Sequence, residues 1–250
     1  MNILIVHQNF PAQYKHVLKA LLAQPEHQVV AFTMNRFRSE SPRLRVVRYQ
    51  AARGTTAGVH PWVSDIETKV IRGEAAFRAA VQLRAEGFVP DVILAHPGWG
   101  ESLFLKEVWP DSPMIIYCEF FYAAEGTDVG FDPEFVRDDP ADACRLRMKN
   151  ANNFMHFDIA DVGLSPTEWQ RSTFPEPFRS RIEAIHDGID TDLIRPNPSA
   201  WLKVRDRVLT RKDEVITFVN RNMEPYRGYH TFMRALPELL ERRPRAQVLI

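Results

Sequence analysis

The feature that most limits the fold of this 250-residue chain is a series of short apolar runs separated by amphipathic stretches. Residues 3–6, 92–95 and 114–118 are four or five residues long and rich in isoleucine, leucine and valine. A run of that length and composition is typical of a strand buried on both faces of a parallel sheet. The intervening segments are long enough to form crossover helices. The sequence therefore predicts an α/β fold, a Rossmann-like doubly wound parallel sheet.

The other expected elements continue this alternation. Further strands are predicted at 28–33, 160–164 and 182–185, and helices at 65–86, 102–108 and 142–157. Another helix is expected to follow Asn9 as its N-cap, with Pro11 in its first turn, where a missing N–H costs nothing. Residues 119–141 are expected to form an acidic loop, which carries Asp128, Asp132, Glu134, Asp138 and Asp139.

A second domain is expected to begin near residue 200, because residues 187–200 are rich in turn formers. The first domain would span 1–199. Residues 200–250 would be an incomplete opening β-α-β unit, with a basic helix at 200–210, a strand at 215–219, a helix at 229–241 and a strand at 246–250. One such unit leaves both strand edges and one face uncovered, so we expect the chain to be a fragment.

Composition excludes several classes of protein. With 45% hydrophobic and 26% charged residues the chain is globular, not disordered. Thirty-two basic residues balance thirty-two acidic ones, which disfavours binding to duplex nucleic acid while leaving a local anion site open. The two cysteines, Cys118 and Cys144, favour neither a disulfide framework nor a zinc site and suit a reducing cytoplasm. No apolar run approaches the ~20 residues of a membrane span, and peripheral membrane contact stays open.

Candidate site residues follow the strands, because ligands of open parallel sheets bind at the carboxyl ends of strands. His96 and Glu119 are the candidates for catalysis, since each comes directly after a buried run. Glu119 could equally be a paired structural carboxylate. The residues expected to line a cleft or acceptor site are His7, Asn9, Gly98 and Trp99. The first loop lacks GxGxxG, so a dinucleotide fingerprint is absent, and Asn9 could be a plain helix cap.

The loop at 220–228 is a candidate anion site. Arg221 and Arg227 place two guanidinium groups between a strand and a helix, and Gly228 opens that helix, whose N-terminus adds backbone donors. Surface arginines on a basic face are the alternative. The position of Arg221 and Arg227 at a strand end favours a diphosphate site.

Three segments carry a family resemblance. They are Ser-Pro-Thr-Glu-Trp-Gln at 165–170, Ile-His-Asp-Gly-Ile-Asp-Thr-Asp at 185–192, and residues 220–228. Together they resemble glycosyltransferase family 4, the retaining enzymes of GT-B fold. Asp187 stands where asparagine is usual, Asn220 where the first glycine is usual, and Arg227 where lysine is usual. Residues 96–101 and 131–133 are similar to one bacterial subgroup.

The resemblance implies transfer of a sugar from a nucleoside diphosphate donor to an acceptor, with retained anomeric configuration. It implies that Arg221, Arg227 and Gly228 hold the diphosphate and that His96 faces the reacting sugar. The first domain would bind the acceptor, which could be a sugar, a lipid-linked molecule or a small molecule. No metal or other cofactor is expected. We expect the protein to lie in the cytoplasm, and contact with the inner face of the membrane stays open.

Two alternatives and one departure accompany this interpretation. A sugar-nucleotide epimerase of the same fold could use His96 and Glu119 as an acid/base pair. A non-catalytic module that binds an acceptor or a partner is the other alternative. The family's Glu-x7-Glu segment is absent from the sequence, so we expect these 250 residues alone to transfer little or no sugar.

Overall fold

The computed structural model describes residues 1–136 and 139–250 of the chain. Contacts divide the chain into two units. The first unit comprises Met1–Ala124 and Asp139–Gly188, and the second comprises Glu125–Asp138 and Ile189–Ile250. Asp138 of the expected acidic loop lies outside the described residues. The domain boundary at residues 199 and 200 stays a prediction.

The first unit is built on a seven-stranded sheet in the order β3-β2-β1-β4-β5-β6-β7, in which every neighbouring pair is parallel. This confirms the predicted Rossmann-like α/β fold. The strands are β1 (Asn2–Val6), β2 (Gln28–Thr33), β3 (Leu44–Arg48), β4 (Val92–Ala95), β5 (Met114–Tyr117), β6 (Val162–Ser165) and β7 (Ile182–Ala184).

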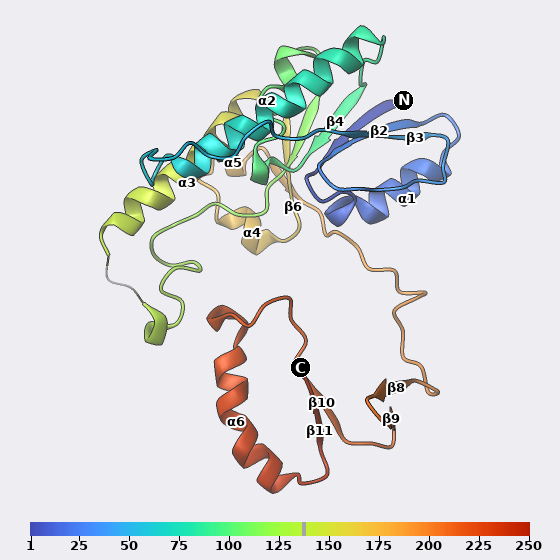
Figure 1. The fold of residues 1–250 in the computed structure, drawn as a ribbon, viewed down its shortest axis with the longest axis vertical. Coiled ribbons are helices and arrows are strands. Elements are labelled where there is room, and N and C mark those ends of the chain that lie inside the picture. The colour runs from blue at the N-terminus through green and yellow to red at the C-terminus, as the bar shows by residue number, and fades with distance from the viewer. Residues whose placement is uncertain (137–138) are drawn as a thin grey trace. The chain divides into compact units, whose positions relative to one another are not determined.

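Helices cover both faces of this sheet, and α2 and α3 run together along one of them (Figure 1). The α-helices are α1 (Lys15–Ala23), α2 (Ser64–Ala85), α3 (Ala141–Ile159), α4 (Glu168–Ser172) and α5 (Glu176–Arg179). The first unit also has three short 3-10 helices: η1 (Ala12–Tyr14), η2 (Pro97–Trp99) and η3 (Leu105–Glu107).

Alternation along the strands produces two hydrophobic cores. In β1, Leu4 and Val6 pack into the core that also contains Ala76 and Ala80 of α2. Ile3 and Ile5 point to the other face, into a smaller core completed by Leu18 of α1 and others. Because both faces of β1 are covered, the run is apolar throughout rather than alternating, as the sequence indicated.

The order of the strands reverses between β1 and β4, which makes this pair the topological switch point of the sheet. β2 and β3 lie on one side of the pair, and β5, β6 and β7 on the other. Val6 is the register partner of Ala95, and Ala95 is the partner of Ile116. The residues that follow these three therefore meet at the carboxyl edge of the sheet: His7, His96 and Tyr117.

Two expectations about local structure in the first unit were wrong. Asn9 caps no helix: its amide N–H donates to Nδ1 of His7 (2.9 Å), its side chain accepts from Asn35 (3.1 Å), and Pro11 is the N-cap of η1. Residues 102–108 form turns and the short η3 instead of an α-helix. The polar Ser102 is fully buried there.

The second unit contains a hairpin at 201–210, where a basic helix was expected. Strands β8 (Trp201–Val204) and β9 (Arg207–Thr210) pair antiparallel across a two-residue loop, in which Arg205 has a φ of +54°. Leu202 and Val204 alternate with polar residues, a period of two that suits a strand better than a helix. The expectation of a helix at 200–210 was therefore wrong.

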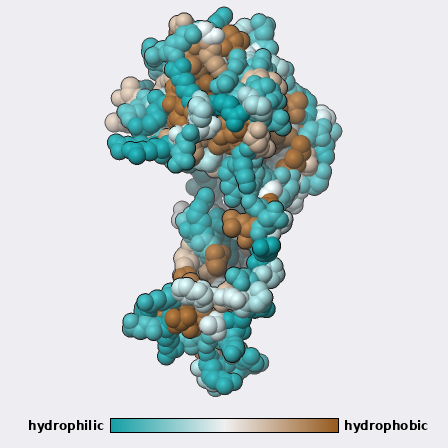
Figure 2. Space-filling view, turned by 90° about the vertical axis from the view of Figure 1, so that its right-hand side faces the viewer, coloured by the Kyte–Doolittle hydropathy of each residue, from teal (hydrophilic) through white to brown (hydrophobic). Residues whose placement is uncertain are grey.

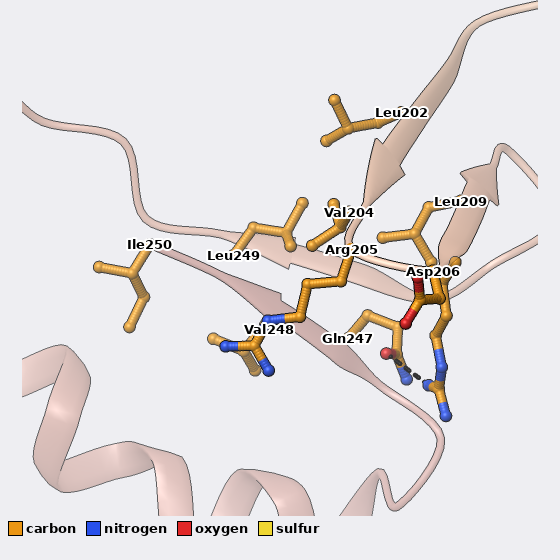
Figure 3. Close-up of a pocket in the computed structure, with 10 residues that line it drawn as sticks. Leu202, Val204, Arg205, Asp206, Leu209, Gln247, Val248, Leu249 and Ile250 are labelled. Carbon is orange, nitrogen blue, oxygen red and sulfur yellow. Dashed lines mark hydrogen bonds between the residues drawn. The ribbon is translucent and has the colours of Figure 1, made fainter.

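A parallel pair completes the second unit. Strand β10 (Val215–Thr217) pairs with β11 (Gln247–Leu249), and α6 (Tyr229–Arg242) connects them. A cavity of about 840 Å³ lies between the hairpin and the pair, lined by Leu202, Leu209 and Val248 among others (Figure 3). Figure 2 shows brown, hydrophobic residues among the hydrophilic ones on the surface. Trp201 and Val219 are exposed hydrophobic residues of this unit.

Candidate active site

Four aromatic rings and one carboxylate gather at the switch point, and we call them the histidine cluster: His7, His96, Trp99, Tyr117 and Glu119. The ring centroids of His7 and His96 are 5.0 Å apart, and those of His96 and Tyr117 are 5.2 Å apart. These separations match the distance between neighbouring strands, because the three residues follow strand positions in register. Trp99 packs against both histidines, at 4.9 and 4.7 Å.

The His96 ring is fixed by its own loop. Its Nδ1 accepts a hydrogen bond from the N–H of Gly98 (3.1 Å), so neutral His96 carries its proton on Nε2. That Nε2 atom lies 3.3 Å from Oε2 of Glu119, at ion-pair distance but without hydrogen-bond alignment. His96 is only 2% exposed, whereas the Glu119 side chain is 57% exposed. A ligand approaching from solvent would therefore meet Glu119 before His96.

The two glycines of this loop are required by close contacts. A Cβ on Gly98 would lie 2.8 Å from Cε1 of His96. Gly100 has a φ of +93°, and a Cβ there would lie 2.5 Å from the backbone oxygen of Lys69 in α2. Only glycine lets the loop pass this close to the imidazole and the helix.

His7 is held as a neutral ring. Its Nδ1 accepts the N–H of Asn9, and its Nε2 lies 2.8 Å from the side-chain oxygen of Gln13, to which it donates. The pKa of His7 is lowered to about 4. Burial is the larger cause and the neighbouring His96 the second. Near neutral pH this side chain is therefore an uncharged wall of the cluster rather than a cation.

Tyr117 and Asp187 were not singled out as partners by the sequence. The Tyr117 hydroxyl donates to the carboxylate of Asp187, with distances of 3.1 and 2.9 Å to its two oxygens. Burial, and next this carboxylate, raise the pKa of Tyr117. The aspartate at a position where the family usually has asparagine thus fixes the ring on which His96 stacks. Tyr117 and Asp187 are seventy positions apart in the sequence. The aspartate in place of the usual asparagine was the one sequence signal that pointed to this bond.

Helix α3 fixes the loops that carry the cluster. Asn152 donates to the carbonyl of Pro97 (3.0 Å), and Asn150 makes two hydrogen bonds with the backbone of Tyr122 (3.0 and 2.6 Å). His156 donates from Nδ1 to the carbonyl of Asn152 and accepts on Nε2 from the Ser102 hydroxyl, both at 2.8 Å. Burial lowers the pKa of His156 to about 4, which keeps it neutral.

Glu101 is a second carboxyl group behind His96. It is fully buried, and that burial raises its pKa, while Tyr49 and the Arg72 guanidinium act in the opposite direction. A raised pKa favours the neutral acid over the carboxylate. Sequence reasoning noted Glu101 only as part of its loop, because burial of a charged residue type has no local signature.

The candidate donor residues belong to the second unit. Arg221 and Arg227 are exposed on the loop between β10 and α6, at the carboxyl end of β10. Nε of Arg227 lies 3.3 Å from Oε2 of Glu224. Gly228 has a φ of +72° and is the N-cap of α6, a conformation that favours glycine. Their assignment to a diphosphate stays a prediction.

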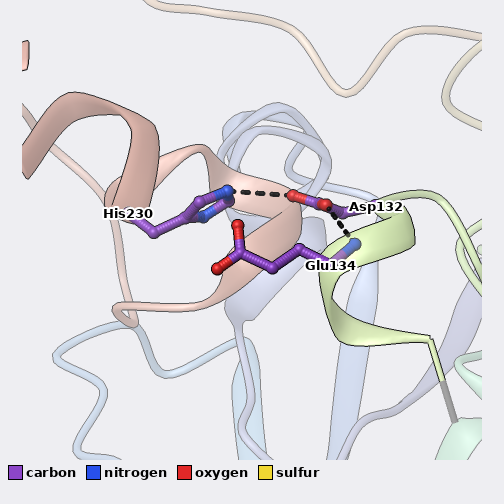
Figure 4. A group of neighbouring side chains, drawn as sticks. All are labelled: Asp132, Glu134 and His230. Atoms are coloured by element: carbon purple, nitrogen blue, oxygen red, sulfur yellow. Dashed lines mark hydrogen bonds and ion pairs between the residues drawn. The ribbon is translucent and has the colours of Figure 1, made fainter. Parts of the chain in front are cut away.

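A group of possible metal ligands also lies in the second unit. Asp132 and Glu134 of the acidic loop approach His230 of α6, with ligand atoms within 4.8 Å of one another (Figure 4). Oδ2 of Asp132 lies 2.9 Å from Nε2 of His230. The Arg234 guanidinium holds both oxygens of Glu134, at 2.6 and 2.5 Å. Since that cation competes with any metal for Glu134, we describe the group as an ion-pair network between 3-10 helix η4 (Pro133–Phe135) and α6.

A helix that crosses a bilayer must be both long and apolar. Across residues 1–136 and 139–250, no helix is both long enough and apolar enough to cross a bilayer.

Comparison with known proteins gives a family match, a sequence relative and similar solved structures. A GDP-mannose-dependent α-(1-6)-phosphatidylinositol monomannoside mannosyltransferase from Mycolicibacterium smegmatis is 33% identical over 87 residues, which are 34% of this chain and 22% of that protein. The match thus spans about a fifth of that relative's length. Among solved structures, the glycotransferase of kitacinnamycin is 16% identical with a TM-score of 0.49, covering 99% of this chain and 65% of that one. A UDP-N-acetylglucosamine 2-epimerase is 12% identical with a TM-score of 0.48, covering 99% and 62%.

A family model matches well over half of the chain. The model described as "Glycosyl transferase family 4 group" matches residues 25–194, which is well over half of the sequence. This stretch contains β2 to β7 and most of the histidine cluster. The chain belongs to the glycosyl transferase family 4 group.

Proposed function

We propose that the complete protein is a retaining glycosyltransferase, which moves a hexose from a nucleoside diphosphate sugar to an acceptor. The observation that carries this proposal is the family match over residues 25–194, which includes both His96 and Glu119. The mannosyltransferase relative acts with GDP-mannose, which supports a nucleotide-sugar donor in this protein too. Family membership is the stronger support, because the relative matches over so short a segment.

The charges of the reaction suit the residues of this chain. When the bond from the anomeric carbon to the diphosphate breaks, positive charge develops on the sugar and negative charge on the leaving diphosphate. The Glu119 carboxylate, with His96 at 3.3 Å behind it, would stabilise the positive charge. Arg221 and Arg227 would stabilise the leaving group through charge-assisted hydrogen bonds, and the N-terminus of α6 at Gly228 would add backbone donors.

The donor assignment is tested on the full-length protein by nucleotide binding. We expect Arg221→Ala to weaken binding of the nucleoside diphosphate by about 1–3 kcal/mol, the value of roughly one charged hydrogen-bonding group. Arg245→Ala, which removes the same charge from an exposed position outside the loop, is the matched control. Equal affinities of the Arg221 and Arg245 variants, measured by calorimetry, would remove Arg221 from the donor site.

The role of the cluster is tested by separating turnover from binding. We expect His96→Ala and Glu119→Gln to lower transfer much more than they lower affinity for the donor, because both residues would act on the reacting sugar. Equal losses of turnover and of donor affinity would mean that His96 supports the fold instead. Assay of the 250-residue chain beside the full-length protein tests the expectation that this chain alone transfers little sugar.

One observation keeps a second candidate function in view. The contact between His96 and Glu119 could serve as an acid/base pair, which a sugar-nucleotide epimerase needs and a simple binding module does not. The two enzymes differ in their requirement for an acceptor. Conversion of the donor to an epimer in the absence of any acceptor would favour the epimerase, whereas a product that forms only with acceptor present favours the transferase.

A further inference from the structure

One segment of the second unit comes from the first half of the sequence. Residues 125–136 lie between β5 and α3 in chain order, and both of those elements belong to the first unit. The contacts of residues 125–136 nevertheless group them with Ile189–Ile250. We call residues 125–136 the strap. A loop that served only to join β5 to α3 would need no partner in the second unit.

The strap packs on α6 through the short 3-10 helix η4 (Figure 4). Asp132 is the N-cap of η4, where its Oδ1 accepts a hydrogen bond from the N–H of Glu134 (3.0 Å). Its other carboxylate oxygen, Oδ2, lies 2.9 Å from Nε2 of His230 in the first turn of α6. The rings of Phe135 and His230 pack edge to face, with centroids 4.9 Å apart. Only 12% of the His230 side chain remains exposed.

A second contact lies one turn further along α6. The Arg234 guanidinium donates from both terminal nitrogens to the two carboxylate oxygens of Glu134, at 2.6 and 2.5 Å. These hydrogen bonds hold the pKa of Glu134 below its usual range. A bidentate pair of this kind fixes the direction of the contact as well as its distance. His230 and Arg234 are four residues apart, so they share one face of the helix.

The opposite face of α6 packs on the strand pair. Phe232 stacks on Phe218, which follows β10, with ring centroids 4.8 Å apart and an interplanar angle of 14°. Phe232 comes two residues after His230, about 200° further around the helix, so the two side chains point to nearly opposite sides. Helix α6 is therefore held between the strap and the strand pair, and the position of its first two turns depends on both.

The start of α6 carries the candidate donor residues. Gly228 is the N-cap of α6, and its carbonyl accepts the N–H of Phe232 (3.0 Å). Arg227 directly precedes Gly228 and ends the 3-10 helix η5 (Pro225–Arg227). Backbone N–H groups at a helix N-terminus point along the helix axis, so they bind an anion that lies on that axis. A contact in the first two turns of α6 therefore sets the direction of these donors.

We infer that Asp132 and Glu134 of the strap are positioning residues for the donor diphosphate, because they hold the N-terminal turns of α6. The inference rests on the proposed transferase function. It adds a segment from between β5 and α3 to the support of the donor site. Neither carboxylate touches the donor: Asp132 acts through His230, and Glu134 acts through Arg234.

Charge alone predicts the opposite effect of removing Glu134. A carboxylate near a diphosphate site repels the ligand, so by electrostatics its loss would strengthen binding. Loss of a contact that positions α6 would weaken binding instead. The sign of the change in affinity in Glu134→Ala therefore separates a positioning role from a simple effect of charge.

The test measures the affinity of the full-length protein for GDP, UDP, ADP and dTDP by calorimetry. We expect Glu134→Ala to weaken binding of the preferred nucleoside diphosphate about fivefold, the upper value for one exposed ion pair. Asp132→Ala removes both the N-cap of η4 and the contact with His230, and it should weaken binding at least as much. Glu125→Ala is the matched control, because it removes a carboxylate from an exposed position of the same strap. We expect no weakening in that control.

A charge reversal assigns the effect to the contact itself. Arg234→Glu should weaken binding, whereas the double variant Glu134→Arg with Arg234→Glu re-forms the pair with its charges exchanged and should recover most of the lost affinity. The two side chains are 45% and 63% exposed, so the exchange places no charge in a buried position. We expect KM for the donor to rise in the single variants while kcat stays near the wild-type value, since the histidine cluster is unchanged.

The outcomes for this inference and for the proposed function differ. Equal affinities of the Glu134 and Glu125 variants, tighter binding by the Glu134 variant, or a double variant no better than Arg234→Glu would each overturn the inference. If Arg221→Ala weakens nucleotide binding while the strap variants bind as the wild type does, only this inference fails. A wild-type protein that binds no nucleoside diphosphate overturns the proposed function, and this inference with it.

Discussion

At the scale of single residues, the position of His96 depends on the absence of a side chain at Gly98. The imidazole occupies the space into which a Cβ would project, and its Nδ1 takes the Gly98 N–H. Stacking on Tyr117 and the contact with Glu119 both follow from that ring orientation. Gly98 was expected to line a cleft, which stays a prediction; in this structure the group that lies next to it is the protein's own histidine.

We therefore expect Gly98→Ala to displace the His96 ring. A misplacement of about 1 Å at a reacting group can lower turnover by about 10²-fold, and we expect a loss of that order with little change in donor affinity. Turnover and melting temperature of the full-length protein are the measurements. Gly54→Ala is the control, because a Cβ there meets nothing within 4 Å. Turnover of the Gly98 variant equal to that of the Gly54 variant would contradict the argument.

Register explains how much of the cluster could be predicted. His7, His96 and Glu119 were found because each follows a buried apolar run, and neighbouring parallel strands bring such residues together. The bond between Tyr117 and Asp187 could not be found in this way. It depends on the path of the chain after β7, which no local pattern specifies. Asn9 was wrongly predicted to be a helix cap, because its side chain bonds to Asn35, which is far from it in the sequence.

At the scale of secondary-structure elements, α3 is the element that orders the site. Its asparagines reach the loop after β4 and the loop after β5, so one helix sets the distance between the segments that carry His96 and Glu119. Asn150 is 5% exposed, and its side-chain amide bonds to both the N–H and the carbonyl of Tyr122. Without Asn150 the backbone of Tyr122 loses these two hydrogen bonds.

Asn150→Ala is expected to destabilise the protein by about 1–3 kcal/mol, because it removes two hydrogen bonds between a buried side chain and the partly buried backbone of Tyr122. It should also lower turnover, since Tyr122 lies three residues after Glu119. Urea unfolding of the full-length protein gives the first quantity and a transfer assay the second. Cys144→Ala, at an exposed position of the same helix, serves as control. A stable variant with reduced turnover would still support positioning, whereas no change in either quantity would refute it.

The elements that were predicted correctly and those that were missed differ in their pattern. Continuous apolar runs gave β1, β4 and β5, because such runs are needed only where both faces are buried. Strand β3 reads Leu-Arg-Val-Val-Arg at the edge of the sheet and was missed, since an edge strand keeps charged residues. The β8–β9 hairpin was mistaken for a helix because its basic composition outweighed its period of two.

At the scale of the whole molecule, buried titratable groups make stability depend on pH. His7 and His156 each have a pKa lowered to about 4 by burial, while unfolded histidine titrates at about 6.5. Between these values the unfolded chain binds protons that the folded chain excludes. Stability is thus fully present above pH 6.5 and falls as the pH drops, by up to about 1.4 kcal/mol per pH unit for each histidine.

Glu101 contributes with the opposite sign. Its pKa is raised by burial, so the folded chain keeps a proton that the unfolded chain releases. The stability associated with the neutral carboxyl group is present below the unfolded pKa and is lost as the pH rises through the folded value. Below pH 6.5 the two histidines therefore make stability increase with pH, and Glu101 offsets part of that increase.

Two substitutions separate these contributions in urea unfolding of the full-length protein between pH 4.5 and 8. His156→Gln should reduce the slope of unfolding free energy against pH by about 1.4 kcal/mol per unit below pH 6.5, because one excluded proton is removed. Glu101→Gln keeps the size of the side chain and should make the slope steeper. Glu101→Gln should also raise the free energy of unfolding at neutral pH, because the folded chain then no longer has to keep a proton that the unfolded chain releases. A Glu101 variant with an unchanged slope would mean that this carboxyl titrates normally despite its burial, and the neutral acid behind His96 would be ruled out.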